Sequence, residues 1–215
     1  MSMNDIMKLK ERTGAGLKDC KEALEAGGGD FDRAVAILRE KGKAIASKKA
    51  DRIAADGYIG VYSHGGKIGV AVEVNCETDF AAKAEAFQEL VKNVAMQIAA
   101  SAPLYVDETE VPAEELKREK EILRNRARAE KKPENVIEKM LDGQVKKYYA
   151  EVCLLDQPYI KDQAKTVRDV VTETTAKVGE KISIRRFVRF ALGEGIEKRK
   201  EDFAQEVAKV TGKKK

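Results

Sequence analysis

The amino-acid sequence predicts an α+β fold, because its patterning changes from helices to strands and back along the chain. Residues 4 to 41 have the apolar spacing of short helices. Two alternating runs joined by Gly65-Gly66 then predict a β-hairpin, and another alternating run lies near the C-terminus. Helices separate these runs, an order that favours a mainly antiparallel sheet of three to four strands packed on helices.

The first 41 residues are expected to form a small module of three helices. Ile6 and Leu9 share one face of the first helix, and a second helix is expected from Leu17 to Ala26. Asp30 is placed to cap a third helix that begins at Phe31 and has i, i+3, i+4, i+7 apolar spacing. Such a module suits recognition better than catalysis. Residues 42–56, rich in alanine and lysine, are interpreted as a linker that is at least partly helical.

The core is expected over residues 57–200 and begins with the hairpin, whose strands are placed at 58–63 and 67–74. In the second strand Ile68, Val70, Val72 and Val74 share one face. An amphipathic helix follows from about Phe87 to Ile98. Two further helices, Ala113 to Lys131 and another after Pro133, predict an antiparallel helical hairpin. This pair either projects as an exposed arm or packs flat on the sheet.

The last third of the core is expected to contain two strands and a helix. Glu151 to Gln157 is interpreted as a strand that ends at Pro158, and Thr166 to Lys177 as a helix. Lys181 to Ala191 alternates as a long strand. The alternation places five residues on one face of that strand: Ile182, Ile184, Arg186, Val188 and Phe190. Residues 201–215 are expected to form a terminal helix around Phe203 and a disordered lysine-rich tail.

Composition argues against several classes of protein. No apolar run reaches transmembrane length and no signal-peptide pattern occurs, so we expect a soluble, cytoplasmic chain. Three separated cysteines and one histidine argue against a disulfide scaffold, a zinc site or another metal site, and no cofactor is expected. The net charge of +4 falls by three to +1 without the terminal lysines, which gives little support for direct nucleic-acid binding.

The segment from Asn75 to Phe80 carries the strongest functional signal, because an acid and an aromatic ring meet where a strand gives way to a helix. Thr78 or Asp79 can act simply as the helix N-cap, and Phe80 can be a core residue. Alternatively, Asp79 and Phe80 project outward together. No phosphate-binding loop, nucleophile elbow or Cys/His pair accompanies the segment, so a binding or regulatory protein is favoured over an enzyme.

Three motifs together resemble the bacterial elongation factor Ts family: ERTGAGLKDCK at 11–21, EVNCETDF at 73–80 and GEGIE at 193–197. The resemblance spans roughly residues 3 to 200 and fits the short form of the family, with one core repeat. It implies a guanine-nucleotide exchange factor without covalent chemistry that binds elongation factor Tu, both GDP-bound and nucleotide-free. It also implies that the N-terminal module is similar to ubiquitin-associated (UBA) domains.

The resemblance assigns roles to particular residues. It implies that Asp79 and Phe80, flanked by Thr78 and Ala81, insert near the partner's Mg²⁺ and nucleotide site. Our hypothesis is that Phe80 is the wedge and that Asp79 orients or secures the loop. The resemblance further implies that Lys10, Leu17, Lys18 and His64 contact the partner. From the residues alone, Leu17 can equally be a core residue of the small module, and His64 can simply face water.

The resemblance also implies that short members of the family work as homodimers, in which two cores supply what one longer chain would. Two other interpretations stay open. The N-terminal module alone suggests a helical, ubiquitin-like adaptor. Arg185, Arg186, Arg189 and the lysine tail suggest an RNA-associated translation protein, although arginines on alternate faces of a strand do not form one stripe.

Overall fold

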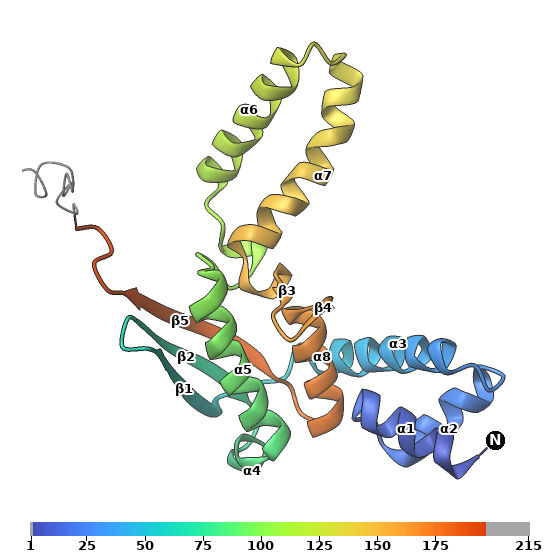
Figure 1. Cartoon of the computed structure of the whole chain (residues 1–215). Helices are drawn as coiled ribbons and strands as arrows, with labels where there is room; N and C mark the ends of the chain where they lie inside the picture. The colour runs from blue at the N-terminus through green and yellow to red at the C-terminus, as the bar shows by residue number, and fades with distance from the viewer. Residues whose placement is uncertain (1, 197–215) are drawn as a thin grey trace, which may run out of the picture.

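A computed structural model describes residues 2–196 and confirms the α+β fold. Figure 1 shows a helical module at the N-terminus, a sheet with helices packed on it, and a helical arm. The helices are α1 (Met3–Thr13), α2 (Leu17–Ala26), α3 (Phe31–Lys49), α4 (Asp79–Lys83), α5 (Glu85–Ser101), α6 (Ala113–Ala129), α7 (Glu134–Val152) and α8 (Val167–Val178), with short 3-10 turns η1 (Glu108–Glu110) and η2 (Leu154–Asp156). The strands are β1 (Asp56–His64), β2 (Ile68–Cys76), β3 (Pro158–Tyr159), β4 (Asp162–Thr166) and β5 (Ser183–Ala191).

The main sheet is antiparallel and has three strands in the order β1-β2-β5. The β1–β2 hairpin turns at Gly65 and Gly66, as the Gly-Gly pair predicted. Val61 lies opposite Ala71 in this hairpin, and Ala71 lies opposite Val188 of β5. The remaining strands, β3 and β4, form a separate two-stranded sheet.

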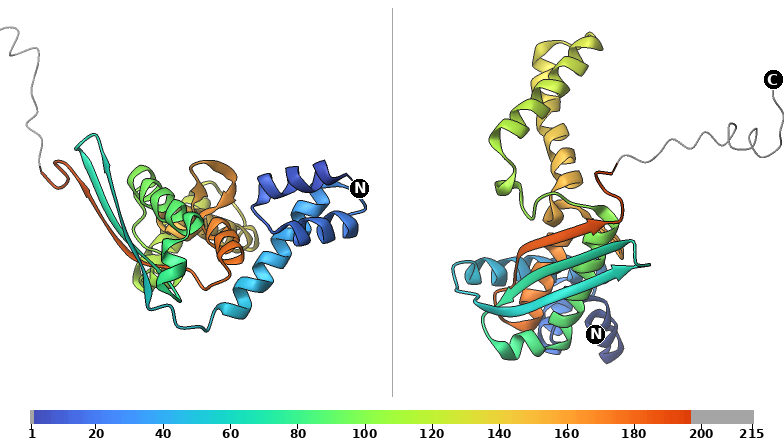
Figure 2. Two further views of the ribbon diagram at one scale, coloured as in Figure 1. Left: turned by 90° about the horizontal axis from the view of Figure 1, so that it is seen from below. Right: turned by 90° about the vertical axis from the view of Figure 1, so that its left-hand side faces the viewer.

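The hydrophobic core lies between one face of the main sheet and α5, and it extends to α8, which packs against α5. The predicted inward residues of β2, from Val70 to Val74, are buried against α5 residues such as Phe87. Gly60 of β1 permits the close approach of α5, because a Cβ there would lie 2.4 Å from a methyl carbon of Val91. In the right-hand view of Figure 2 the other face of the sheet lies toward the viewer, and no described helix covers it.

The N-terminal module consists of three helices, as predicted. Ser2 and Asp5 form a capping box that begins α1, and Asp30 caps α3. Leu9, Cys20 and Leu24 form its small core. The module packs against the rest of the chain through α3 and α8, and α3 continues to Lys49, so the first half of the expected linker is helical.

The α6–α7 hairpin forms an exposed arm, which decides between the two packing arrangements left open by the sequence (Figure 1). Ile137 and Leu141 of α7 pack on Ala127 of α6. At the base of the arm the hydroxyls of Tyr148 and Tyr105 donate to Glu115 at 2.5 and 2.7 Å, and these bonds lower the pKa of Glu115. The arm is therefore anchored to the core by a hydrogen-bonded cluster.

The strand predicted from Glu151 to Gln157 is wrong. The chain continues in α7 to Val152, makes a single parallel bridge between Cys153 and Tyr105, and then turns through η2. The amide of Gln157 donates back to the carbonyls of Cys153 and Leu154, which bends the backbone where a strand would extend it. The apolar run reflects the burial of Leu154, not strand pairing.

The prediction of a single face for β5 is also wrong beyond Ile184, because a β-bulge interrupts the strand. Glu73 pairs with Arg186 whereas Val74 pairs with Ile184, so Arg185 is the extra residue. Ile184 therefore faces the core, while Val188 and Phe190 lie on the uncovered face. The expected helix around Phe203 and the lysine tail lie outside the described residues.

Candidate functional site

The turn that joins β2 to α4 holds the candidate site. Thr78 has extended backbone angles, and its Oγ1 accepts a hydrogen bond from the Ala81 amide at 3.3 Å. Thr78 is thus the N-cap that the sequence suggested, and Asp79 is the first helical residue, where a carboxylate interacts favourably with the helix dipole. The α4 helix has only five residues, so the cap is a large part of what holds its backbone.

Phe80 projects into solvent and is not a core residue. Its side chain is 81% exposed, the second highest value among the large hydrophobic residues described. Ala81 and Ala82 on the next positions are buried against the core. The cap and the two buried alanines therefore fix which way α4 faces, and this orientation leaves Asp79 and Phe80 outside.

Lys83, one turn beyond, contacts both projecting residues. Its Nζ lies 2.7 Å from Asp79 Oδ2 and 5.9 Å from the centre of the Phe80 ring. The hydrogen bond from Lys83 lowers the pKa of the Asp79 carboxyl, and Asp79 in turn raises the pKa of Lys83. Lys83 was not among the residues predicted from the sequence, although its i, i+4 spacing from Asp79 is a readable signal.

Carboxylates hold the turn from the other side. Both oxygens of Glu180 accept hydrogen bonds from Thr78: Oε2 from the amide at 3.0 Å and Oε1 from the hydroxyl at 2.7 Å. Glu77 accepts from the Lys181 amide at 2.6 Å and pairs with Arg52 at 3.1 Å, and these bonds lower the pKa of Glu77. Glu180 lies 102 residues from Thr78, so no local pattern could have indicated this contact.

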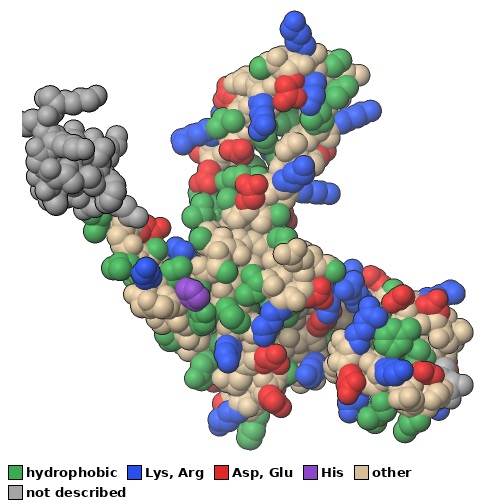
Figure 3. Space-filling model, viewed as in Figure 1, with side chains coloured by type: hydrophobic (Ala, Val, Ile, Leu, Met, Phe, Trp, Pro, Cys, Tyr) green, Lys and Arg blue, Asp and Glu red, His purple; other side chains and the backbone are tan. Residues whose placement is uncertain are grey.

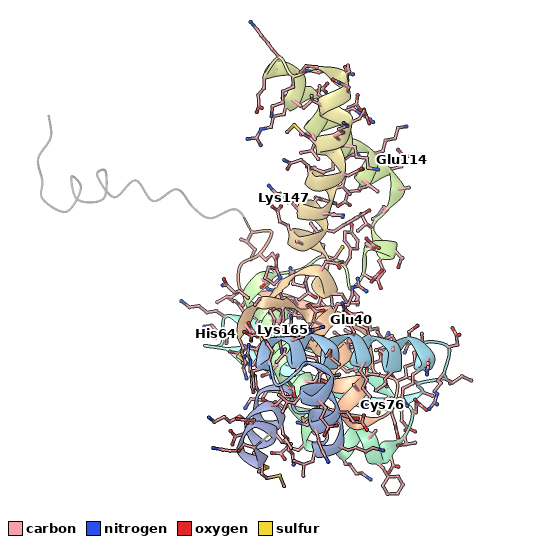
Figure 4. The ribbon with its side chains drawn as sticks, turned by 90° about the vertical axis from the view of Figure 1, so that its right-hand side faces the viewer. Glu40, His64, Cys76, Glu114, Lys147 and Lys165 are labelled. Carbon is pink, nitrogen blue, oxygen red and sulfur yellow. The ribbon has the colours of Figure 1, made fainter. Side chains whose placement is uncertain are left out.

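The other predicted contact residues lie apart from this turn. Lys10 is exposed on α1, and Leu17 and Lys18 are exposed at the start of α2, so Leu17 is not a core residue of the module. His64 is exposed where β1 ends, and its Nδ1 lies 3.1 Å from the hydroxyl of Tyr62. Figure 4 shows His64 and Cys76 toward opposite ends of the hairpin. The predicted residues thus span an extended surface and do not form one pocket.

Metal-binding and nucleophilic groups are sparse in the described part of the chain. Residues 2–196 hold no group of three His, Cys, Asp or Glu side chains placed to bind a metal ion. All three cysteines are buried and free. Burial raises the pKa of each thiol, to about 12 for Cys153.

A groove of about 540 Å³ lies between the N-terminal module and α8. Its walls carry charges of both signs, including Lys41, Lys165 and Asp169. Gly42 of α3 approaches Ala176 of α8 at its margin, so the two parts touch there. The groove marks a partly open junction between module and core.

The arginines that suggested RNA binding make hydrogen bonds within the core, to β2 and to α5. Arg185 and Arg186 both donate to Glu73, at 2.8 and 2.7 Å, and the Nε of Arg189 donates to the Ala99 carbonyl at 3.4 Å. On the face shown in Figure 3, basic and acidic side chains are interspersed over the arm and the N-terminal module. None of the helices described is long and apolar enough to cross a membrane.

The family model that matches the chain and the individual proteins similar to it carry the same name. A family model described as elongation factor TS matches residues 17–194. Proteins named elongation factor Ts are similar to the chain over nearly its whole length. One from Geobacter metallireducens is 58% identical over 208 residues, covering 96% of both chains. One from Desulforamulus reducens is 56% identical over 209 residues, covering 97% of this chain and 96% of the relative.

Proposed function

Since the chain belongs to the elongation factor Ts family, we propose that it is the nucleotide-exchange factor of elongation factor Tu. In this proposal it binds the GDP-bound partner, promotes GDP release and leaves a nucleotide-free complex to which GTP can bind. It acts by binding alone and performs no covalent chemistry. The observation that carries the proposal is the exposed Phe80 ring beside Asp79 on a capped, fixed turn.

Phe80 acts as a wedge in the proposed mechanism. Mg²⁺ requires a nearly regular octahedral shell, which the bound nucleotide and the protein share. An aromatic side chain that displaces the backbone around this shell spoils the geometry and weakens nucleotide binding. Phe80 suits this task because it is 81% exposed among the described residues, with Lys83 Nζ 5.9 Å from the centre of its ring. Asp79 and Lys83 supply polar contacts around the ring, while Thr78 and Ala81 fix the backbone beneath it.

Thermodynamic linkage makes the proposal quantitative. If the protein weakens GDP binding by a given factor, GDP must weaken binding of the protein by the same factor. The nucleotide-free partner should therefore bind this protein much more tightly than the GDP-bound partner. A wedge that entered without weakening GDP binding would show equal affinity for both forms.

The N-terminal module and the hairpin provide the other contacts in this proposal. Lys10, Leu17 and Lys18 are exposed on the three-helix module, and His64 is exposed near the tip of the hairpin. Leu17 offers an apolar anchor flanked by charge, an arrangement typical of protein interfaces. We propose that these residues provide affinity for the partner, while Phe80 displaces the partner's backbone and so promotes GDP release.

The uncovered face of the sheet supports a homodimer. On this face Val61 of β1 lies opposite Ala71 of β2, which lies opposite Val188 of β5, and Phe190 lies opposite Gly69. Phe190 is 70% exposed and Val61 is 77% exposed, so the half of the face nearer the hairpin turn is apolar and open, whereas Glu73 and Arg186 form an ion pair on the other half. Because twofold association pairs the same patch on both copies, two such faces can pack as a sandwich. We propose that a second copy of this chain covers it.

These roles fit a cytoplasmic protein whose partner is another protein, with neither a membrane nor a nucleic acid as a direct ligand. The test is the affinity of the protein for elongation factor Tu with and without saturating GDP, measured by titration calorimetry. The proposal predicts tight binding to the nucleotide-free form and a large loss of affinity when GDP is bound. Equal affinities for the two forms would overturn it.

A further inference from the structure

The β2–β5 ladder ends beside the candidate site. Beyond its last backbone pair, side-chain carboxylates join the two segments by hydrogen bonds to backbone amides. The last backbone pair joins Asn75 and Ser183. If this register continued past Cys76 and Ile182, Glu77 would fall opposite Lys181 and Thr78 opposite Glu180. At these positions each segment uses a carboxylate to bind an amide of the other: Glu77 binds the Lys181 amide, and Glu180 binds the Thr78 amide. We call these four residues the clasp.

The two carboxylates of the clasp have different surroundings. Glu77 also pairs with Arg52 of the linker, whose carbonyl accepts a hydrogen bond from Lys181 Nζ at 2.8 Å. Glu77 therefore ties the linker to the core. Glu180 contacts only Thr78 among the hydrogen bonds described, through both carboxylate oxygens. It follows the left-handed Gly179 that ends α8, which places its side chain toward the turn before α4.

We propose that Glu180 is a positioning residue for nucleotide exchange: by holding the amide and hydroxyl of Thr78, it fixes the α4 turn so that Phe80 is presented to the partner in one orientation. The inference rests on the proposed function, which it deepens. Glu180 need not touch the partner to act in this way. Its effect passes through Thr78, whose hydroxyl donates to Glu180 and at the same time caps α4 by accepting from Ala81.

Glu180 can influence the direction of the Phe80 ring because the ring makes few contacts of its own. An exposed ring has no packed neighbours to define its position, so its direction depends on the backbone that carries it. A helix of five residues is marginal without outside support. Fixing the turn before binding removes an entropic cost that the complex would otherwise bear, which is the general benefit of a preorganised interface.

Four variants test this role in two assays. The first assay is release of fluorescent GDP from elongation factor Tu by the full chain, and the second is amide hydrogen exchange of residues 77–83 in the free protein. Glu180→Ala should lower the catalysed release rate by about tenfold and speed amide exchange in the turn. Glu180→Gln keeps an acceptor for the Thr78 amide, so its release rate should stay within about threefold of wild type.

Controls separate positioning from general damage to the fold. Glu173→Ala removes another glutamate of the same region, one that pairs with Lys165 at 2.8 Å, and should leave the release rate unchanged. In a Phe80→Ala background, Glu180→Ala should change the release rate by less than about twofold, because a turn without its ring has nothing to position. A variant that merely unfolds the protein would lower the rate in both backgrounds.

Each outcome decides a separate claim. If wild-type protein does not accelerate GDP release, the proposed function fails, and the role of Glu180 in exchange fails with it. If wild type is active and Glu180→Ala matches it, the positioning role alone is overturned. Equal losses from Glu180→Ala with and without Phe80, or unchanged amide exchange at residues 77–83, would also contradict that role.

Discussion

Replacing Phe80 with alanine should separate the function of this chain from its stability. The ring is 81% exposed, so its removal leaves no cavity in the core. Exposed substitutions of this kind change the free energy of unfolding by about 0.5 kcal/mol or less. Thr78 still caps α4, and Ala81 and Ala82 still anchor it, so the turn should keep its shape.

The same change should have a large effect on nucleotide exchange. Truncating an aromatic anchor at an interface typically costs about 2 kcal/mol or more. If that loss falls on the exchange transition state, catalysed GDP release slows by about 30-fold, since 1.4 kcal/mol corresponds to a factor of ten. Stopped-flow release of fluorescent GDP from elongation factor Tu, at protein concentrations well below saturation, measures this change directly.

Leu104→Ala is the matched control. Leu104 is an apolar residue that is 64% exposed and lies beside the end of α7, where its amide bonds to the Val152 carbonyl. Losing its side chain should alter neither exchange nor thermal stability. An unchanged release rate for Phe80→Ala would refute the wedge assignment. A large fall in its melting temperature would refute the conclusion that Phe80 lies outside the core.

Three further predictions concern other parts of the molecule. Lys83→Met removes the ion pair with Asp79 while keeping an apolar stem, and should slow GDP release by only about two- to fivefold, because exposed ion pairs contribute little. A loss as large as that of Phe80→Ala would contradict this ranking. Val61→Glu places a charge on the uncovered sheet face and should convert a dimer into a monomer by light scattering, whereas an unchanged mass would argue against that interface. The three buried thiols have raised pKa values. At pH 8 they should therefore react slowly with a thiol reagent in the native protein and quickly in denaturant. Rapid labelling of the native protein would be inconsistent with their burial.

Elements with a strong local signal were predictable from the sequence. Asp30 and Thr78 were suggested as caps, and both accept the expected backbone hydrogen bonds. The amphipathic helix from about Phe87 to Ile98 buries the face that its spacing indicated. In these cases the local apolar spacing and the cap residue are enough to predict the helix. Contacts with residues distant in sequence do not change the prediction.

Elements that depend on tertiary contacts were not predictable in the same way. The β-bulge at Arg185 exchanges the two faces of β5, and alternation alone cannot reveal it because apolar residues occupy both faces. The run around Leu154 has the composition of a strand, but its pairing segment offers a single bridge. A local pattern indicates which secondary structure a segment favours, whereas the neighbouring segments available for pairing determine which one it forms.

The candidate site shows the same division. The sequence placed Asp79 and Phe80 at a strand-to-helix turn but could not say whether the ring pointed inward. The burial of Ala81 and Ala82 decides this, since it commits the opposite side of α4 to the core. Glu180 could not be foreseen, because its contact with Thr78 depends on how β2 and β5 end side by side.

The rate of GDP release from elongation factor Tu, measured with and without this protein, shows directly whether the protein is an exchange factor. The measurement should use preloaded fluorescent GDP, excess unlabelled GDP and a range of protein concentrations. We predict that the release rate rises with protein concentration and approaches a plateau far above the spontaneous rate. A release rate that stays at the spontaneous value at every concentration would show that the protein is not an exchange factor for elongation factor Tu.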